Sequence, residues 1–177
     1  MSTSFPHRIH PNLLQVLILV LLVIPARLPA LEEDTEQPLY LEADSAEIDE
    51  ATSTSVYTGN VFVKQGSMEL RGDRVTVHHD AEHKPELIIA VGSPATYRQE
   101  VEGEKNKKQE VKAHALRMEY DRAKDEITLI EQAVLFQGKD NFRNDRIVYD
   151  RAKAQVKAGT VAEGKERVKI TISPSRK

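Results

Sequence analysis

Apolar and polar residues alternate along most of the chain from Leu39 onward. Val75 and Val77 alternate with polar neighbours in one stretch, and residues 116–120 repeat the pattern in another. A period of two places successive side chains on opposite faces, which is typical of a β-strand with one apolar face. The pattern therefore predicts a chain of half-buried strands, with at most a turn of helix at 32–36.

Short turn signals interrupt this alternation at frequent intervals. Gly, Asn, Asp and Pro favour turns because they adopt or fix backbone conformations that other residues avoid. The signals are Gly59-Asn60, Gly66-Ser67, Gly72-Asp73, Gly92-Ser93-Pro94, Gly138-Lys139-Asp140 and Asn144-Asp145. Short strands between closely spaced turns predict antiparallel pairing of strands that follow one another in the chain.

The chain also contains an internal repeat with an offset of 72 residues. The repeat pairs 59–66 with 131–138 and 70–75 with 142–147, and shorter echoes lie at 43–49 and 113–121. Each unit is a strand, a turn and another strand, repeated about four times, and it buries its apolar face only by stacking on its neighbours. We therefore predict an all-β fold of two facing antiparallel sheets, a sandwich or jelly roll that is open at its ends.

The alternation also selects the side chains that face the interior. Most of them are aliphatic, and the chain contains no Trp. The inward positions are Leu39, Leu41, Val61, Val63, Val75, Val77, Met118, Tyr120, Leu135, Phe142 and Tyr149. Ordinary core packing explains such positions in any sheet protein, and an aliphatic space between two splayed sheets would also suit acyl chains.

The first thirty residues have the layout of a secretory signal. Arg8 and nearby histidines give a weakly basic start, an apolar run follows at 13–24, and small residues precede an acidic stretch. The apolar run is shorter than the roughly 20 residues that a membrane-spanning helix needs. We expect cleavage after Ala30, which leaves a single domain at 31–177; an uncleaved membrane anchor is the alternative.

Charge and composition narrow the function classes. The chain carries 25 basic and 28 acidic residues, and loss of Arg8 and Arg27 with the signal leaves a net charge of −5. An acidic chain argues against nucleic acid as the partner, because phosphate binding needs a basic face. The chain has no cysteine, which excludes disulfides, thiolate metal sites and thiol catalysis, and which is compatible with the periplasm.

Two further segments complete the expected domain. A run of charges without apolar residues predicts an exposed loop near 100–111, which joins the two halves of the repeat. A last alternating stretch predicts a C-terminal edge strand at 167–173, which ends before Pro174.

Three groups of polar residues resemble sites of chemistry, and each has a structural explanation. His78-His79-Asp80-Ala81-Glu82-His83 contains metal-ligand residue types, but adjacent strand residues point to opposite faces, so a solvated turn is favoured. The repeated pairs Asp73-Arg74 and Asp145-Arg146 suit turns, because catalysis needs one asymmetric arrangement. Scattered acids leave a periplasmic carbohydrate-active enzyme as the weaker alternative. We therefore expect no catalytic residue, no metal and no cofactor.

Five segments carry a family resemblance through their order and spacing: QPLYLEAD at 37–44, YTGNVFVKQG at 57–66, GSPATY at 92–97, MEYDRAKD at 118–125 and KERV at 165–168. Together they resemble the OstA-like family of periplasmic lipopolysaccharide-transport bridge proteins of the LptA type. The resemblance implies a slightly twisted β-jelly roll with an apolar groove for lipid A acyl chains. At the matching motifs, its groove positions fall on Leu39, Leu41, Tyr97 and Tyr120.

The resemblance also implies partners. Copies of the chain would stack head to tail into a bridge between an LptC-like inner-membrane protein and the N-terminal domain of an LptD-like outer-membrane protein. The candidate interface strands lie at the two ends of the domain and contain Leu39, Leu41, Val168, Ile170 and Ile172. Arg or Lys near the groove mouth would meet lipid phosphates, without a pattern that selects them. A membrane-anchored LptC-like component and a closed structural β-scaffold stay open as alternatives.

Overall fold

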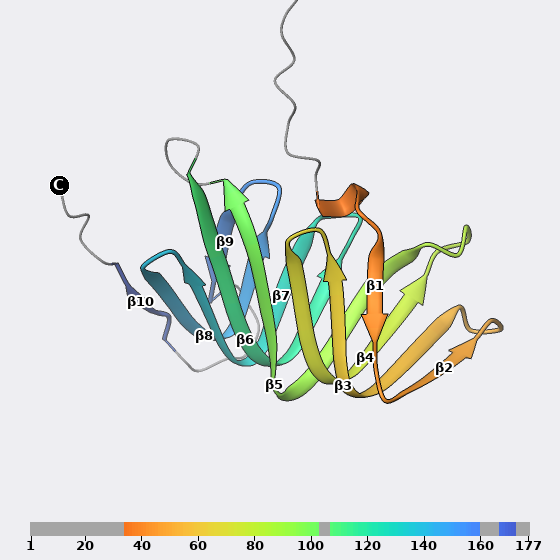
Figure 1. The fold of residues 1–177 in the computed structure, drawn as a ribbon. Coiled ribbons are helices and arrows are strands. Elements are labelled where there is room, and N and C mark those ends of the chain that lie inside the picture. Colours follow the sequence, from red (N-terminus) through yellow and green to blue (C-terminus); the bar gives the residue numbers. More distant parts are fainter. Residues whose placement is uncertain (1–33, 103–106, 160–166, 173–177) are drawn as a thin grey trace, which may run out of the picture. The chain divides into compact units, whose positions relative to one another are not determined.

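The computed structural model describes residues 34–102, 107–159 and 167–172, and the expected signal sequence lies outside these residues (Figure 1). The elements are η1 (Asp34–Glu36), β1 (Leu39–Glu42), β2 (Ser45–Asp49), β3 (Thr54–Gln65), β4 (Met68–His79), β5 (Pro85–Glu102), β6 (Lys108–Asp121), β7 (Glu126–Gln137), β8 (Asp140–Asp150), β9 (Gln155–Ala158) and β10 (Lys169–Thr171). The predicted all-β class is confirmed. Within the described ranges, no helix has the length and apolar character that crossing a membrane requires.

All the strands belong to one antiparallel sheet. Its order is β1-β3-β4-β5-β6-β7-β8-β10, with β2 paired to the other part of β3 and β9 to the other part of β8. The two ends of the domain therefore form the two edges of the sheet, β1 with β2 and β9 with β10. In the part of the chain that the structure describes, these edge strands pair on one side only.

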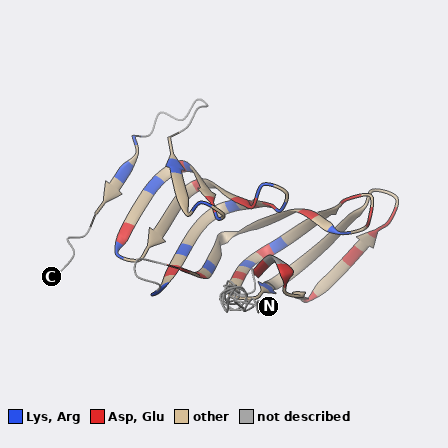
Figure 2. Ribbon diagram, turned by 90° about the horizontal axis from the view of Figure 1, so that it is seen from above, with Lys and Arg blue, Asp and Glu red and all other residues tan. Residues whose placement is uncertain are grey.

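The two edges differ in charge. Residues 39–49, which form β1 and β2, include four acidic residues and no Lys or Arg. The strands β9 and β10 include Lys157 and Lys169 and no acidic residue. Figure 2 shows the same contrast, with red segments along β2 and a blue segment on β10. Each edge thus has the charge that the other edge attracts.

A line of β-bulges folds the sheet over on itself. The register of β3 shifts between Thr58 and Val61, and the pairings of β4 to β8 shift at the same level. Gly59 and Asn60 have φ values of 81° and 48° at this bulge, which Gly and Asn adopt more readily than other residues. Because bulges bend strands, each long strand runs through one layer and continues into the other (Figure 1).

The folded sheet encloses one apolar core. We call the layer with β1 and β10 the first layer, and the layer with β2 and β9 the second layer. Val63 and Leu135 of the first layer and Val75 and Leu129 of the second are at most 1% exposed. Burying each such side chain contributes about 1.5–3 kcal/mol, so packing between the layers stabilises the fold. Opposite the crease, the hairpin tips of the two layers form what we call the mouth.

The backbone preserves the 72-residue repeat. Strands β3 and β4 recur as β7 and β8 at this offset. Their hairpins turn at Gly66 and Gly138, whose φ values are 59° and 60°. The predicted strand-turn-strand units are therefore present, but they form one continuous folded sheet and not two separate sheets.

Some predicted turns are bends within strands. Gly66-Ser67 and Gly138-Lys139 form hairpins, whereas Gly59-Asn60, Gly72-Asp73, Gly92-Ser93-Pro94 and Asn144-Asp145 lie at the crease, inside long strands. A bulge and a turn need the same conformationally permissive residues, so composition does not separate them. In the same way, β5 extends to Glu102 and β6 begins at Lys108, so paired strands occupy much of the segment expected to be a charged loop.

Candidate functional site

The interior between the layers brings together all the side chains that the sequence placed there. Of the eleven positions that the alternation selects and Tyr97, which the resemblance adds, nine lie in the buried core: Val61, Val63, Val75, Val77, Tyr97, Met118, Tyr120, Leu135 and Tyr149. Leu39, Leu41 and Phe142 are partly buried and pack against the core. These three are on β1 and β8, so the incompletely covered positions lie at and next to the sheet edges.

An apolar track crosses the molecule from one edge to the other. In the first layer, the paired inward residues are Leu41, Val63, Leu70, Tyr97, Ala113, Leu135, Phe142 and Ile170. Val63 is 0% exposed, whereas Ile170 at the C-terminal end of this row is 52% exposed. At the other end of the row Leu41 is partly buried and packs against the core, while Ile48 of β2, at the same sheet edge but in the second layer, is 69% exposed. The interior is thus covered in the middle and less covered at both sheet edges, where the exposed Ile170 and Ile48 mark an interaction surface.

A polar network spans the mouth beside this apolar interior. Arg151, in the turn after β8 of the second layer, donates from Nε to Gln99 Oε1 of the first layer at 3.1 Å. Its guanidinium also pairs with Asp125 at 2.9 Å and lies 3.9 Å from Asp34. The Arg151 side chain is only 4% exposed, so the two layers are joined here through a buried cation.

Asp34 completes the network on the first layer. Its carboxylate accepts hydrogen bonds from the backbone N–H and the hydroxyl of Ser67, both at 2.7 Å. It also accepts one from Gln99 Nε2 at 2.7 Å. These bonds fix η1 on the hairpin between β3 and β4, and they bring one carboxylate near Arg151.

Three tyrosines lie between the network and the apolar core. Tyr97 donates to Gln99 Oε1 at 2.5 Å. The Tyr120 hydroxyl donates to Asp125 at 3.1 Å and accepts from Arg151. The third, Tyr149, is 0% exposed, and its hydroxyl has no hydrogen-bond partner among the residues described. One buried donor at the mouth is therefore unused.

Burial sets the protonation of these groups. It raises the pKa of the Tyr97, Tyr120 and Tyr149 hydroxyls, which therefore stay protonated at neutral pH. Burial alone lowers the pKa of Arg151, but the neighbouring Tyr97, Tyr120 and Asp125 outweigh it and raise that pKa. The mouth thus joins a permanent cation and hydroxyl donors to an apolar interior, an arrangement that suits an amphiphile with an anionic head.

Asp34, Gln99, Asp125 and Arg151 are not among the predicted site residues. They lie on η1, on β5 and in two different turns, and Asp34 and Gln99 are 65 positions apart. No spacing rule connects residues that meet only because the sheet folds over. Tyr97, Tyr120 and Tyr149 were predicted to face inward, but only as lining and not as hydrogen-bond donors.

The side chains of the histidine-rich segment at 78–83 point in different directions in the structure. His78 is hydrogen-bonded to Thr54 at 3.3 Å and His79 to the buried Ser55 at 3.0 Å. The Asp80 carboxylate accepts hydrogen bonds from the backbone of Glu82 and Lys84. The two imidazoles therefore lie on opposite faces of the sheet, and the carboxylate stabilises the turn.

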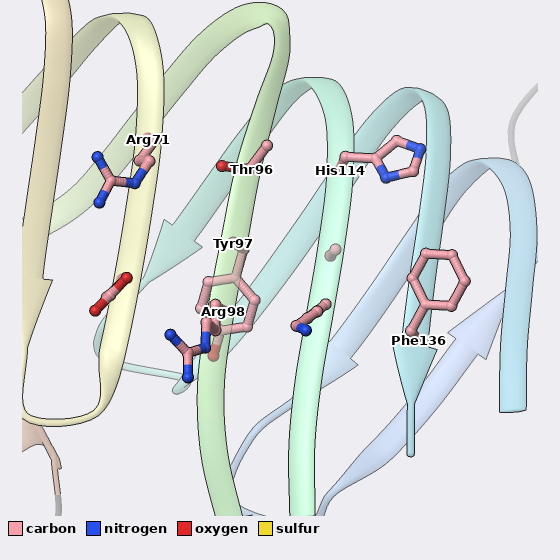
Figure 3. A pocket seen from close by; sticks show the side chains of 9 residues that line it. Arg71, Thr96, Tyr97, Arg98, His114 and Phe136 are labelled. Atoms are coloured by element: carbon pink, nitrogen blue, oxygen red, sulfur yellow. The ribbon is translucent and has the colours of Figure 1, made fainter. Parts of the chain in front are cut away.

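A separate shallow hollow lies on the outer face of the first layer (Figure 3). Its volume is about 300 Å³, and its lining includes Arg71, Arg98, His114 and Phe136. Figure 3 shows Arg71 and Arg98 on neighbouring strands, with His114 and Phe136 on the other side of the hollow. Arg98 pairs with Glu110, and the sheet separates this hollow from the apolar interior.

The sequence matches, over residues 40–155, the family described as "LptA/(LptD N-terminal domain) LPS transport protein". The chain is 36% identical over 153 residues to the lipopolysaccharide export system protein LptH of Pseudomonas aeruginosa. This alignment covers 84% of this chain and 86% of LptH. It is 34% identical over 163 residues to the lipopolysaccharide export system protein LptA of Escherichia coli K12, in an alignment that covers 90% of this chain and 85% of LptA.

Two further similarities concern the fold and part of a larger protein. The crystal structure of LptH, described as the LptA homologous periplasmic component of the lipopolysaccharide transport device of P. aeruginosa, superposes with a TM-score of 0.71 at 35% identity. The match covers 80% of this chain and 99% of LptH. A segment of 62 residues is 40% identical to the LPS-assembly protein LptD of Aliivibrio fischeri and spans 7% of that protein.

Proposed function

Because this chain belongs to the family of LptA and LptD N-terminal domain lipopolysaccharide-transport proteins, we propose that it binds lipopolysaccharide and shields the lipid A acyl chains between its two layers. The observation that carries the proposal is the apolar track, which is buried at Val63, partly buried at Leu41 and exposed at Ile170. Such a track offers a lipid one continuous apolar path from edge to edge.

The energetics require continuous cover. Exposing acyl chains to water costs about 0.8 kcal/mol per CH2, so a chain of about a dozen carbons costs on the order of 10 kcal/mol. Side chains fill the middle of the interior, where Val63, Val75 and Ala90 are 0% exposed. Acyl chains therefore enter as the layers part. Hydrogen bonds within each layer survive this motion, because the layers meet through the crease and through side-chain packing.

The two edges suit head-to-tail association of copies. The strands of the first layer alternate in direction from β1 to β10, so a second copy in the same orientation presents its β1 antiparallel to β10 of the first. Main-chain pairing of two such exposed edges is β-augmentation. The inward row would then continue from Ile170 of one copy to Leu41 of the next, and the apolar path would cross the interface.

Charges at the edges support the same arrangement. Arg143 and Lys169 lie directly opposite each other on β8 and β10, and like charges in such a pair are destabilising. Glu42, on the outer face of β1, occupies the same row of paired residues. In a head-to-tail pair, Glu42 of one copy therefore offsets the repulsion between Arg143 and Lys169 of its neighbour.

The proposed bridge has an LptC-like inner-membrane protein at one end and the N-terminal domain of an LptD-like outer-membrane protein at the other. Similarity to a segment of LptD supports this, since a related domain offers a related edge. The proposed location is the periplasm, after cleavage of residues 1–30. The mass of the exported protein tests that cleavage: a new terminus after Ala30 is expected, whereas an intact Met1 supports the membrane-anchored alternative.

Site-specific photo-crosslinking tests lipid binding. A photo-crosslinking amino acid at Leu41 faces the interior, and one at Glu42 on the same strand faces outward. We expect lipopolysaccharide adducts at Leu41 and few at the matched control Glu42. Adducts at Glu42 without adducts at Leu41 contradict an interior acyl site.

Charge reversal tests the edges. Glu42→Lys and Lys169→Glu should each weaken self-association, measured by sedimentation velocity at low salt, because each creates a repulsive pair across the interface. Mixing the two single variants should restore association, since opposite charges then face each other at every junction between unlike variants. Equal association by all four samples contradicts this arrangement of the copies.

A further inference from the structure

We infer that Arg151 binds a phosphate group of the lipid headgroup, and that the Asp34 carboxylate occupies this position when no lipid is bound. The inference rests on the proposed function and specifies it further. Arg and Lys near the mouth were expected to meet phosphates, and the structure selects Arg151 because its guanidinium lies inside the mouth, 4% exposed.

The donor set at Arg151 matches a phosphate. A guanidinium presents several N–H groups in one plane and binds phosphate oxygens in pairs. The hydroxyls of Tyr97 and Tyr120 contact the same network, and Tyr149 lies in the same inward row of the second layer as Tyr120, with Ile127 between them. A phosphate has enough acceptor oxygens for the guanidinium and also for the unused Tyr149 hydroxyl.

Asp34 is the displaceable partner. Asp125 contacts the guanidinium at 2.9 Å, whereas Asp34 lies 3.9 Å from it, beyond hydrogen-bond distance. Asp125 belongs to the second layer, as Arg151 does, so that pair persists when the layers part. Asp34 is fixed to Ser67 and Gln99 of the first layer, so it moves away from Arg151. A phosphate then replaces one anion with another, without leaving a buried charge unpaired.

The location agrees with the shape of a phosphorylated glycolipid. Tyr97, Tyr120 and Tyr149 form the boundary between the polar network and the apolar core. Acyl chains that lie along the core would hold a phosphorylated sugar at this boundary. One residue of the second layer would thereby recognise the head while the interior covers the tails.

Binding of two lipids tests the inference. The probe is displacement of a fluorescent acyl ligand by diphosphoryl lipid A and by the same lipid with its phosphates removed. The unaltered protein should prefer the phosphorylated form about tenfold, the effect of one charge-assisted hydrogen bond. Arg151→Gln should remove this preference and keep binding of the dephosphorylated lipid. The matched control Arg71→Gln, on the outer face, should keep the preference.

Asp34→Asn provides a second measurement that does not depend on losing a buried cation. It should tighten binding of diphosphoryl lipid A several-fold, because the competing charge is gone, and leave the dephosphorylated lipid unchanged. A preference that survives Arg151→Gln, or equal effects of Asp34→Asn on both lipids, overturns the inference while lipid binding itself stands. If the unaltered protein binds neither lipid, the proposed function fails and the inference fails with it.

Inorganic phosphate separates the two sources of the same group. A rise in Tm with millimolar phosphate that Arg151→Gln removes supports the site and shows that free phosphate also enters it. Stabilisation by lipid alone supports the site as one for headgroups. Equal stabilisation of the Arg151→Gln variant by phosphate overturns the assignment to Arg151.

Discussion

Removing the unused Tyr149 hydroxyl should raise the stability of the protein, whereas removing the hydroxyl of Tyr97 or Tyr120 should lower it. Tyr149→Phe removes a buried polar group that has no partner among the described residues. Leaving such a group unsatisfied costs about 1–3 kcal/mol, so the variant should be more stable than the parent protein by about that amount. The ring stays in place, and the packing around it is kept.

Tyr120→Phe and Tyr97→Phe are matched controls of opposite sign. The first removes a hydroxyl that donates to Asp125 and accepts from Arg151, which should cost about 1.5–3 kcal/mol because both partners are charged. The second removes a bond to Gln99 and should cost about 1 kcal/mol. Each of the three changes removes one tyrosine hydroxyl, so the variants differ only in the hydrogen bonds that this hydroxyl made.

Urea denaturation at pH 7 measures all three variants, with m-values compared to confirm the same transition. Thermal unfolding should follow, at about 2–4 °C per kcal/mol for a domain of this size. If Tyr149→Phe is destabilised as much as Tyr97→Phe, the hydroxyl is satisfied in solution, and the proposal that it awaits a ligand oxygen loses its support.

Two further predictions concern a carboxylate and the repeated hairpin. The hydrogen bond from Lys124 lowers the pKa of Asp121 in the folded protein. The ionised Asp121 therefore stabilises the fold above the unfolded pKa of about 3.9, and this stabilisation is lost as the pH falls through the lower folded pKa. In urea denaturation, Asp121→Asn should be less stable than the parent protein at pH 7 and equally stable near pH 2. Gly66→Ala and Gly138→Ala both place Ala at positive φ, at a cost of about 1–2 kcal/mol, but an added Cβ at Gly66 meets Asp34 whereas at Gly138 it meets the flexible end of Gln109. Gly66→Ala should consequently show the larger loss of Tm, and equal losses would mean that Asp34 is loosely held.

The sequence predicted the sides of the strands better than the path of the sheet. A period of two fixes which residues share a face, so Val63, Val75 and Leu135 could be placed in the interior from the alternation alone. Whether Gly59-Asn60 makes a hairpin or a bulge depends on whether the chain reverses there. That depends on pairing with β4 across the sheet, which local composition does not contain.

The mouth escaped prediction for a related reason. Arg151 and Gln99 lie 52 positions apart and meet only because the bulges fold one layer onto the other. A polar residue at the end of a strand is normally solvated, so Arg151 in a turn after Asp150 carried no signal of burial. Its environment is set by contacts with Gln99, Asp34 and Asp125, which are distant in the chain, and not by its neighbours in the chain.

The repeat nevertheless contains a signal for this site. Positions 72 residues before Tyr120, Tyr149 and Arg151 are Ile48, Val77 and His79, so the second copy of the repeat has tyrosine hydroxyls at two positions where the first copy has aliphatic side chains. Two identical copies of the repeat would give the fold two equivalent ends. Equivalent ends would not orient a ligand that has one polar head. Because burying a hydroxyl is unfavourable unless it is bonded, the Tyr149 hydroxyl, which has no partner among the described residues and stands where the other copy of the repeat has Val77, is a cost to folding that a ligand at this end would offset.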